Sequence, residues 1–307
     1  MIAFDALDDA ELASLLRSAP AGAAGVGGGS SVIDADGVPV FAKRIPITDR
    51  ELAHPHSTAN LFDLPLACQY GMHRLPGPGF GAWRELAANT IMGSPTLYHW
   101  RVLPGRPPVA PEHRDIDAVV TQFGGSPAVR TRFEELAAAT HSLVLFFEYL
   151  PHPASALLTD PVAVERQLFE IVAALRTHDM LHMDAHFDNM RTDGTRLHLV
   201  DYGLATSPHF ELSEAERDFV TRHAGHDADY AAMRLVNWLA TTACGVPSAP
   251  AIRNAHVLRY ANGDIPATVP APVAGILTRH AAAAARMNSF CYRLYDGEDV
   301  EYGRPRS

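Results

Sequence analysis

Cysteine is scarce in this chain, and long apolar runs and an excess of positive charge are missing. The three cysteines stand alone without CxxC spacing, so neither a disulfide framework nor a zinc ribbon is indicated. Lys and Arg number 25 against 35 Asp and Glu, which argues against a protein that grips the phosphate backbone of DNA or RNA. No stretch approaches the ~18 consecutive apolar residues of a membrane helix, and the acidic N-terminus lacks a basic signal region. We therefore expect no nucleic-acid or membrane partner, and a cytoplasmic protein with reduced thiols.

The distribution of patterns along the chain predicts an α+β fold in two parts. The 307 residues, 47% of them hydrophobic, are enough for a large core. The first part, over 1–150, is rich in glycine and strand patterns and contains an irregular stretch at about 46–80 that resembles an insertion. The second part, over 151–307, is mostly helical in pattern. We place the boundary near residue 151.

The first part begins its strand pattern after a glycine-rich bend. Asp36-Gly37 has the chemistry of a hairpin turn, and "VPVFAKRI" alternates like a strand that carries Lys43. Residues 82–92 show helical spacing. The apolar run "HSLVLFFEYLP" at 141–151 predicts a buried strand with Glu148 and Tyr149 at its exit.

Start and stop signals define the helices of the second part. Thr159 or Asp160 caps a helix that continues through Leu175. Ser213 and Glu216 have the spacing of a capping box. A long apolar helix follows, closed by Gly245, and a last helical block spans about 271–295.

Two short stretches gather the polar chemistry. "LHMDAHFDNM" at 181–190 holds two histidines, two aspartates and an asparagine, and "LHLVDYGLA" follows at 197–205. Taken singly, the first stretch is compatible with a polar turn or with a metal cluster of the kind that hydrolases build. The order of all the elements decides between these interpretations.

That order resembles the protein-kinase-like fold, and most closely its aminoglycoside phosphotransferase and choline kinase branch. The matching residues are His182, Asp184, His186 and Asn189, followed by Asp201-Tyr202-Gly203 in the place of Asp-Phe-Gly. The likeness covers about residues 20–245. It implies a bilobal fold with a small antiparallel β-rich N-lobe and a mostly helical C-lobe.

The resemblance also implies a role for each matching residue. Asp184 would accept the proton of an attacking hydroxyl, and Asn189 and Asp201 would be catalytic residues that supply oxygen ligands to Mg²⁺. Lys43 would hold the α- and β-phosphates of ATP. The acid that pairs with it is Glu51 or Glu85; we favour Glu85, which fits if 46–80 is an insertion, because Glu51 follows the strand too soon. Backbone amides of the bend would cover the phosphates, and the exit of the buried strand would be the hinge that meets adenine. The bend residues are Gly25, Gly27, Gly28, Gly29 and Ser30, and the hinge residues are Glu148, Tyr149 and Leu150.

Some residues depart from the protein-kinase pattern. Ser30 stands where a third glycine would complete the glycine motif, His186 replaces the usual lysine, and no Ala-Pro-Glu follows. The last two departures favour the small-molecule or atypical branch, whereas the incomplete glycine motif slightly favours a pseudokinase. Asp227 or Asp229 is placed either to anchor the 181–190 loop through its backbone amides or simply to cap a helix.

The implied function is an ATP- and Mg²⁺-dependent phosphotransferase that moves the γ-phosphoryl group to a hydroxyl of a small molecule or of a peptide Ser or Thr. The alternative is a pseudokinase that serves as a nucleotide-binding or scaffold module. A metal-dependent hydrolase ranks last, because it leaves Lys43 and Asp201-Tyr202-Gly203 without a role.

Overall fold

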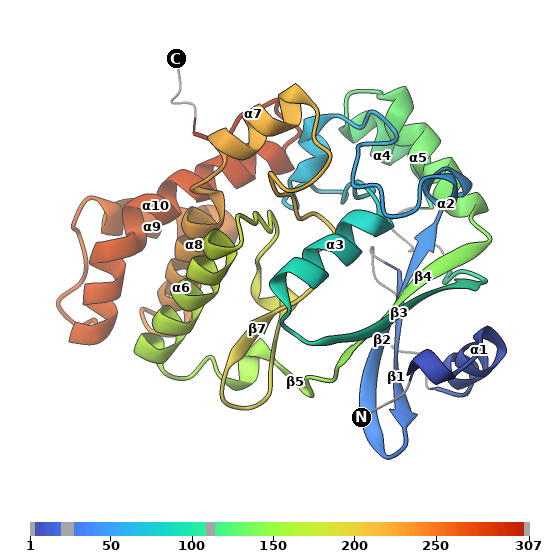
Figure 1. The fold of residues 1–307 in the computed structure, drawn as a ribbon. Helices are drawn as coiled ribbons and strands as arrows, with labels where there is room; N and C mark the ends of the chain where they lie inside the picture. The colour runs from blue at the N-terminus through green and yellow to red at the C-terminus, as the bar shows by residue number, and fades with distance from the viewer. Residues whose placement is uncertain (1–3, 20–27, 109–113, 304–307) are drawn as a thin grey trace. The chain divides into compact units, whose positions relative to one another are not determined.

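The structure, a computed structural model, describes residues 4–19, 28–108 and 114–303 (Figure 1). It is α+β, with one four-stranded and one three-stranded sheet among many helices. The chain forms two compact units. Unit 1 consists of Met1–Gly71, Leu75–Leu150 and Val200–Phe219, and unit 2 of Met72–Arg74, Pro151–Leu199 and Val220–Ser307. One passage between them falls at Leu150–Pro151, close to the expected boundary, but residues 200–219 belong to unit 1.

The centre of unit 1 is an antiparallel sheet with the strand order β1-β2-β4-β3. Asp36 and Gly37 both have positive φ, at 54° and 81°, as a two-residue hairpin turn between β1 and β2 requires. The predicted hairpin and the buried strand β4 are confirmed, whereas β3 was not foreseen. The strands are β1 (Gly29–Ala35), β2 (Val38–Ile47), β3 (Leu97–Pro104) and β4 (His141–Glu148).

The alternation of side chains divides this sheet into two apolar faces. Val144 and Phe146 of β4 pack with Leu12 and Leu16 of α1 (Asp9–Ser18). Leu143, Leu145 and Phe147 face the other way and pack with Ala82, Trp83 and Leu86 of α3 (Ala82–Met92). Because successive strand residues point to opposite faces, every second residue of β2 from Phe41 to Ile47 belongs to the α3 face. Lys43 is one of these residues and therefore points to the face that α3 covers.

Residues 46–80 are more ordered than expected. β2 continues through Ile47, and α2 (Asp49–Ala53) follows, with a capping box between Thr48 and Glu51. Arg132 reaches Glu51 at 2.7 Å in a buried ion pair, which ties this stretch to α5. The sequence did not predict this helix, because five residues held by a distant arginine leave almost no periodicity, but from 54 to 80 the chain is irregular apart from η2 (Leu66–Gln69), as expected. The other helices of unit 1 are η1 (Phe4–Ala6), η2 (Leu66–Gln69), α4 (Ile116–Gln122) and α5 (Pro127–Ala138).

Unit 2 is built on packed helices beside a small sheet in the order β5-β6-β7. The Asp160 cap, the Ser213–Glu216 capping box and the last helix over 271–295 are confirmed. α9 was not foreseen. The elements are β5 (His152–Pro153), η4 (Ala154–Ala156), α6 (Pro161–Thr177), η5 (Phe187–Asn189), β6 (Met190–Thr192), β7 (Leu197–Leu199), α8 (His226–Thr242), α9 (Pro250–Ala261) and α10 (Ala271–Tyr295); α7 (Glu214–Arg222) runs from unit 1 into unit 2.

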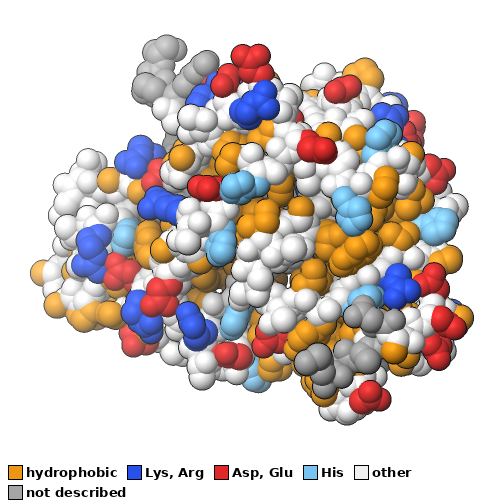
Figure 2. All heavy atoms as spheres, viewed as in Figure 1, with side chains coloured by type: hydrophobic (Ala, Val, Ile, Leu, Met, Phe, Trp, Pro, Cys, Tyr) orange, Lys and Arg blue, Asp and Glu red, His pale blue; other side chains and the backbone are white. Residues whose placement is uncertain are grey.

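The surface carries charges of both signs. On the face drawn in Figure 2, Lys and Arg side chains are scattered among Asp and Glu and form no continuous basic area. Among the described helices, none is both long enough and apolar enough to cross a membrane.

Candidate functional site

Lys43 lies in unit 1 between two carboxylates. Its Nζ is 2.6 Å from Oε1 of Glu85 and 2.8 Å from Oδ1 of Asp201. The strand parity explains the first contact, because Lys43 lies on the face of the sheet that α3 covers, and Glu85 belongs to the buried side of α3. The pairing of Lys43 with Glu85, expected from the resemblance, is present in the structure.

Burial and charge compete at this triad. Burial by itself would lower the pKa of Lys43, but the Asp201 and Glu85 carboxylates outweigh it and raise that pKa, so the lysine stays cationic. Burial raises the pKa of Glu85 to about 7, with the Lys43 ammonium acting against it and the Asp201 carboxylate adding to it. Asp201 is the accessible member, with 43% of its side chain exposed. The triad therefore offers a fixed cation and one solvent-facing carboxylate.

In the turn at 201–203, the carboxylate of Asp201 lies close to the backbone of the turn. Asp201 has a φ of 64°, a left-handed conformation that aspartate tolerates better than most residues. A Cβ added at Gly203 would lie 3.3 Å from Oδ1 of Asp201 and 3.4 Å from Oε2 of Glu85. The glycine after Tyr202 thus leaves room for both carboxylates beside Lys43.

The described end of the glycine-rich bend lies next to Lys43 across the sheet. Ser30 is the cross-strand partner of Lys43, and Gly29 that of Arg44. Gly28 has a φ of 122°, and a Cβ there would lie 1.9 Å from the carbonyl oxygen of Arg44, so only glycine fits. Gly25 and Gly27 of the expected phosphate-covering bend lie outside the described residues.

The expected hinge residues leave the sheet at the end of β4. The backbone N–H of Glu148 donates to the carbonyl of Thr96 at 2.9 Å, and its carboxylate accepts from the Thr96 hydroxyl at 3.2 Å. Tyr149 is partly buried, and Leu150 is buried. The tie to Thr96 was not foreseen, because β3, which begins just after it, was missed.

In unit 2, Asp227 of α8 anchors the backbone of the loop at 181–190. Its two carboxylate oxygens accept the backbone N–H of His182 at 2.7 Å and of Met183 at 3.1 Å. Burial alone would raise the pKa of Asp227, but His226 and His182 outweigh it and lower the pKa. Of the two aspartates left open by the sequence, Asp227 is therefore the anchor. Asp229 instead accepts from Tyr302.

Asp184 and Asn189 are hydrogen-bonded to each other within this loop. The amide nitrogen of Asn189 donates to the carbonyl of Asp184 at 3.0 Å and to its Oδ2 at 3.3 Å. Oδ1 of Asp184 is buried and has no hydrogen-bond partner among the described residues. A buried acceptor without a donor is costly, so this oxygen retains the capacity to accept a hydrogen bond.

The two histidines of the loop accept hydrogen bonds from its backbone. His182 is fully buried, and its Nδ1 accepts the backbone N–H of Asp184 at 3.3 Å. Nδ1 of His186 accepts the N–H groups of Asp188 and Asn189 and so caps η5. The side chain of Asp188 is 92% exposed.

The hairpin after this loop links Asn189 to Asp201 along the chain. Asn189 directly precedes β6, and β7 ends at Leu199, two residues before Asp201. Met190 pairs with Leu199, so the chain enters and leaves the hairpin at the same end. Two peptide units then limit the Cα of Asp201 to about 7 Å from that of Leu199.

The described residues contain no group of three or more His, Cys, Asp or Glu side chains that could hold a metal ion. A histidine–aspartate cluster of the hydrolase type is thus not formed by the 181–190 loop. The oxygen donors that could serve a metal are the Asn189 amide oxygen, whose amide nitrogen is already engaged, and the exposed Asp201 carboxylate.

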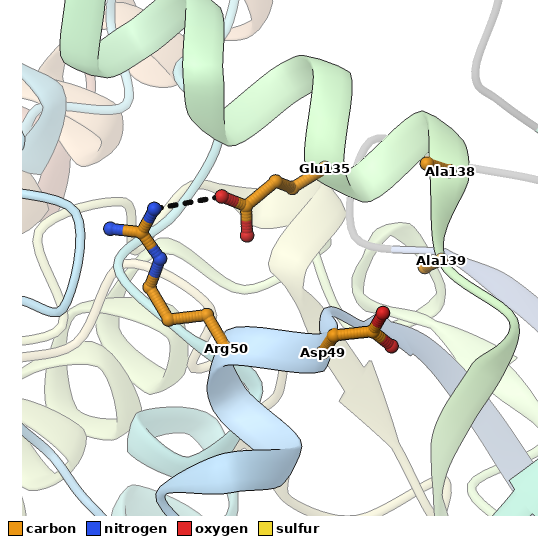
Figure 3. A pocket seen from close by; sticks show the side chains of 5 residues that line it. All are labelled: Asp49, Arg50, Glu135, Ala138 and Ala139. Atoms are coloured by element: carbon orange, nitrogen blue, oxygen red, sulfur yellow. Dashed lines mark hydrogen bonds and ion pairs between the residues drawn. The ribbon is translucent and has the colours of Figure 1, made fainter.

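A shallow pocket elsewhere in unit 1 lies between α2 and α5 (Figure 3). Arg50 and Glu135 point toward each other across it, 2.8 Å apart, and Asp49, Ala138 and Ala139 complete its lining. Because the Arg50 guanidinium and the Glu135 carboxylate already neutralise each other, this pocket has little charge with which to bind a ligand.

No protein-family model matches the chain, and no curated protein matches it either.

Proposed function

We propose that this protein has a bilobal protein-kinase-like fold and is an ATP- and Mg²⁺-dependent phosphotransferase. It would move the γ-phosphoryl group to a hydroxyl of a small molecule or of a peptide Ser or Thr. The observation that carries the proposal is the placement of Lys43 between Glu85 and Asp201. A surface lysine in a strand needs no such partners, whereas a lysine that binds phosphates must be held in place and kept charged.

Each group has a part in this reaction. Lys43 would bind the phosphates of ATP, and Glu85 would fix the direction of the ammonium. Oδ1 of Asp184, which lacks a donor among the described residues, would accept a hydrogen bond from the attacking hydroxyl and take its proton. The hydroxyl oxygen then forms a bond to the γ-phosphorus, and the bond from that phosphorus to the bridging oxygen of ADP breaks.

The oxygen donors present suit Mg²⁺. This ion prefers a few carboxylate or amide oxygens and completes its shell with water and phosphates, so a cage of three acidic side chains is not required. Asn189 and Asp201 would hold it, and bound Mg²⁺ would neutralise charge on the phosphates. Asp184 would remain free for the acceptor hydroxyl.

The test is Mg·ATP binding and turnover measured side by side in the wild type and two variants. Asp201→Ala should lose Mg·ATP affinity in calorimetry while its circular dichroism stays unchanged. Asp184→Asn should keep that affinity but lose turnover by on the order of 10²-fold or more, the scale of lost general-base help. Asp188→Asn, which removes the same charge from an exposed position of the same loop, is the matched control.

Other functions give different results. A pseudokinase would bind nucleotide without turnover in any variant. A metal hydrolase would lose its metal in Asp184→Asn and show no response to ATP. Unchanged Mg·ATP affinity in folded Asp201→Ala would refute the proposed metal ligand, and equal turnover in wild type and Asp184→Asn would refute the proposed base.

A further inference from the structure

Arg234 is a cation of unit 2 without a polar partner in the part of the chain that the structure describes. It is partly buried on α8 and makes no hydrogen bond or ion pair with any described residue. Four arginines on α9 and α10 form ion pairs with acids: Arg259 with Asp264, Arg279 with Glu165, Arg286 with Asp229 and Arg293 with Glu298.

The position of Arg234 on α8 places it beside the loop that carries Asp184. Residues at i, i+3 and i+7 share one face of a helix, and on α8 these are Asp227, Tyr230 and Arg234. Asp227 holds the backbone of the loop, and the guanidinium carbon of Arg234 is 5.8 Å from the ring centre of Phe187 in the same loop.

Charge effects at neighbouring groups agree with this placement. Burial raises the pKa of Tyr230, the Asp184 carboxylate raises it further and the Arg234 guanidinium lowers it. Burial also raises the pKa of Cys291 to about 12, where Arg234 acts to lower it and Asp184 to raise it. Both charges are thus close to the same two side chains. Even so, Arg234 and Asp184 form no ion pair with each other.

The contact with Phe187 is a weak reason to keep a guanidinium here. At 5.8 Å it is near the distance limit of a cation–π interaction, and such contacts are weak at partly exposed sites. The partly buried guanidinium thus keeps its donors free of acceptors from the described residues. Its five donors form a planar fork that fits a carboxylate or a phosphate in two parallel hydrogen bonds.

We propose that Arg234 binds an anionic group of the acceptor, a carboxylate or a phosphate, while the acceptor hydroxyl is presented to Asp184. This inference rests on the proposed phosphotransferase function and narrows its substrate class. It predicts an anionic acceptor, although the net charge of the chain is −10 and would by itself favour a cationic one.

The experiment is an ADP-release assay with hydroxyl acceptors in matched sets that differ only in charge. Glycerol is compared with D-glycerate and glycerol 3-phosphate, and glucose with glucuronate and glucosamine. Serine peptides flanked by Glu, by Lys or by neutral residues form the third set, so the assay separates small molecules from peptides. We expect turnover with anionic members of one set.

Variants at position 234 then test the residue. Arg234→Gln should raise KM for the anionic acceptor by about 10- to 100-fold, the effect of losing a hydrogen bond to a charged group, with kcat changed little. Arg234→Lys should lose less, because the charge remains without the fork. Arg176→Gln is the control, since it removes the same charge from an exposed position on α6.

Two results would overturn the inference while leaving the phosphotransferase function intact. One is a preference for neutral or cationic acceptors that Arg234→Gln does not change. The other is an equal loss of kcat with every acceptor, which would make Arg234 a support for the Phe187 loop. If the wild type neither binds Mg·ATP nor turns over, the proposed function fails, but the anion site can still be tested by itself. In calorimetric titrations with inorganic phosphate and D-glycerate, weaker binding to Arg234→Gln than to the wild type supports the anion site, and equal binding refutes it.

Discussion

Replacing Asp227 with asparagine should loosen the loop at 181–190 without unfolding the helices around it. Asp227 is almost fully buried, and each of its carboxylate oxygens accepts one backbone N–H, from His182 and from Met183. Asparagine has the same shape but presents an NH₂ group in place of one oxygen. One backbone N–H would therefore face a donor and lose its partner.

The size of the effect follows from these two bonds. A hydrogen bond to a charged group contributes about 1.5–3 kcal/mol, and a buried donor left without an acceptor costs about 1–3 kcal/mol. The variant loses one bond outright and the charge that strengthens the other. The contact between Nδ1 of His226 and Oδ1 of Asp227, at 3.2 Å, loses its carboxylate as well. We expect the loop to be less stable by about 3 kcal/mol, which is about 100-fold in its opening equilibrium.

Amide hydrogen exchange measures this opening directly. The N–H groups of His182 and Met183 should exchange about 100-fold faster in the variant, whereas amides in the middle of α10 should keep their protection. Asp229→Asn is the control on the same helix, since its bonds to Tyr302 and Arg286 are partly exposed and asparagine keeps an acceptor for the tyrosine. Unchanged exchange at both amides in Asp227→Asn would show that the carboxylate does not hold the loop.

Two further variants test unit 1. Because the pKa of Glu85 is raised to about 7, its neutral form favours folding, so that contribution is present below about pH 4.5 and is lost as the pH rises through about 7. Glu85→Gln stays neutral, so urea melts should show it gaining about 3 kcal/mol on the wild type between pH 4.5 and pH 8, and parallel pH profiles would contradict the raised pKa. Gly28→Ala should be destabilised by about 2–4 kcal/mol, because a Cβ there meets the Arg44 carbonyl in a backbone conformation that alanine rarely adopts. Gly37→Ala, which has positive φ but open space, should lose clearly less in the same melts, and equal losses would rule out the clash.

Local rules were enough for the parts of this protein that are fixed over a few residues. The Asp36-Gly37 turn, the apolar run of β4 and the caps at Asp160 and Ser213 appear in the structure as the sequence predicts. The loop at 181–190 was recognised from the spacing of its polar residues, and the strand alternation of β2 already placed Lys43 on one face. In each case the signal lies within one element, where geometry follows directly from periodicity and turn chemistry.

What the sequence could not decide are the contacts between residues far apart in the chain. Glu85 lies 42 positions from Lys43, and only the packing of α3 on the sheet shows that it, and not Glu51, is the partner; Glu51 is taken by Arg132. Asp227 and Asp229 are equivalent in sequence, yet the rotation of α8 turns one to the loop and the other to Tyr302. Arg234 carries no motif at all. That no described acid pairs with it is a property of the folded surroundings, because pairing depends on which side chains the tertiary structure brings within a few ångströms.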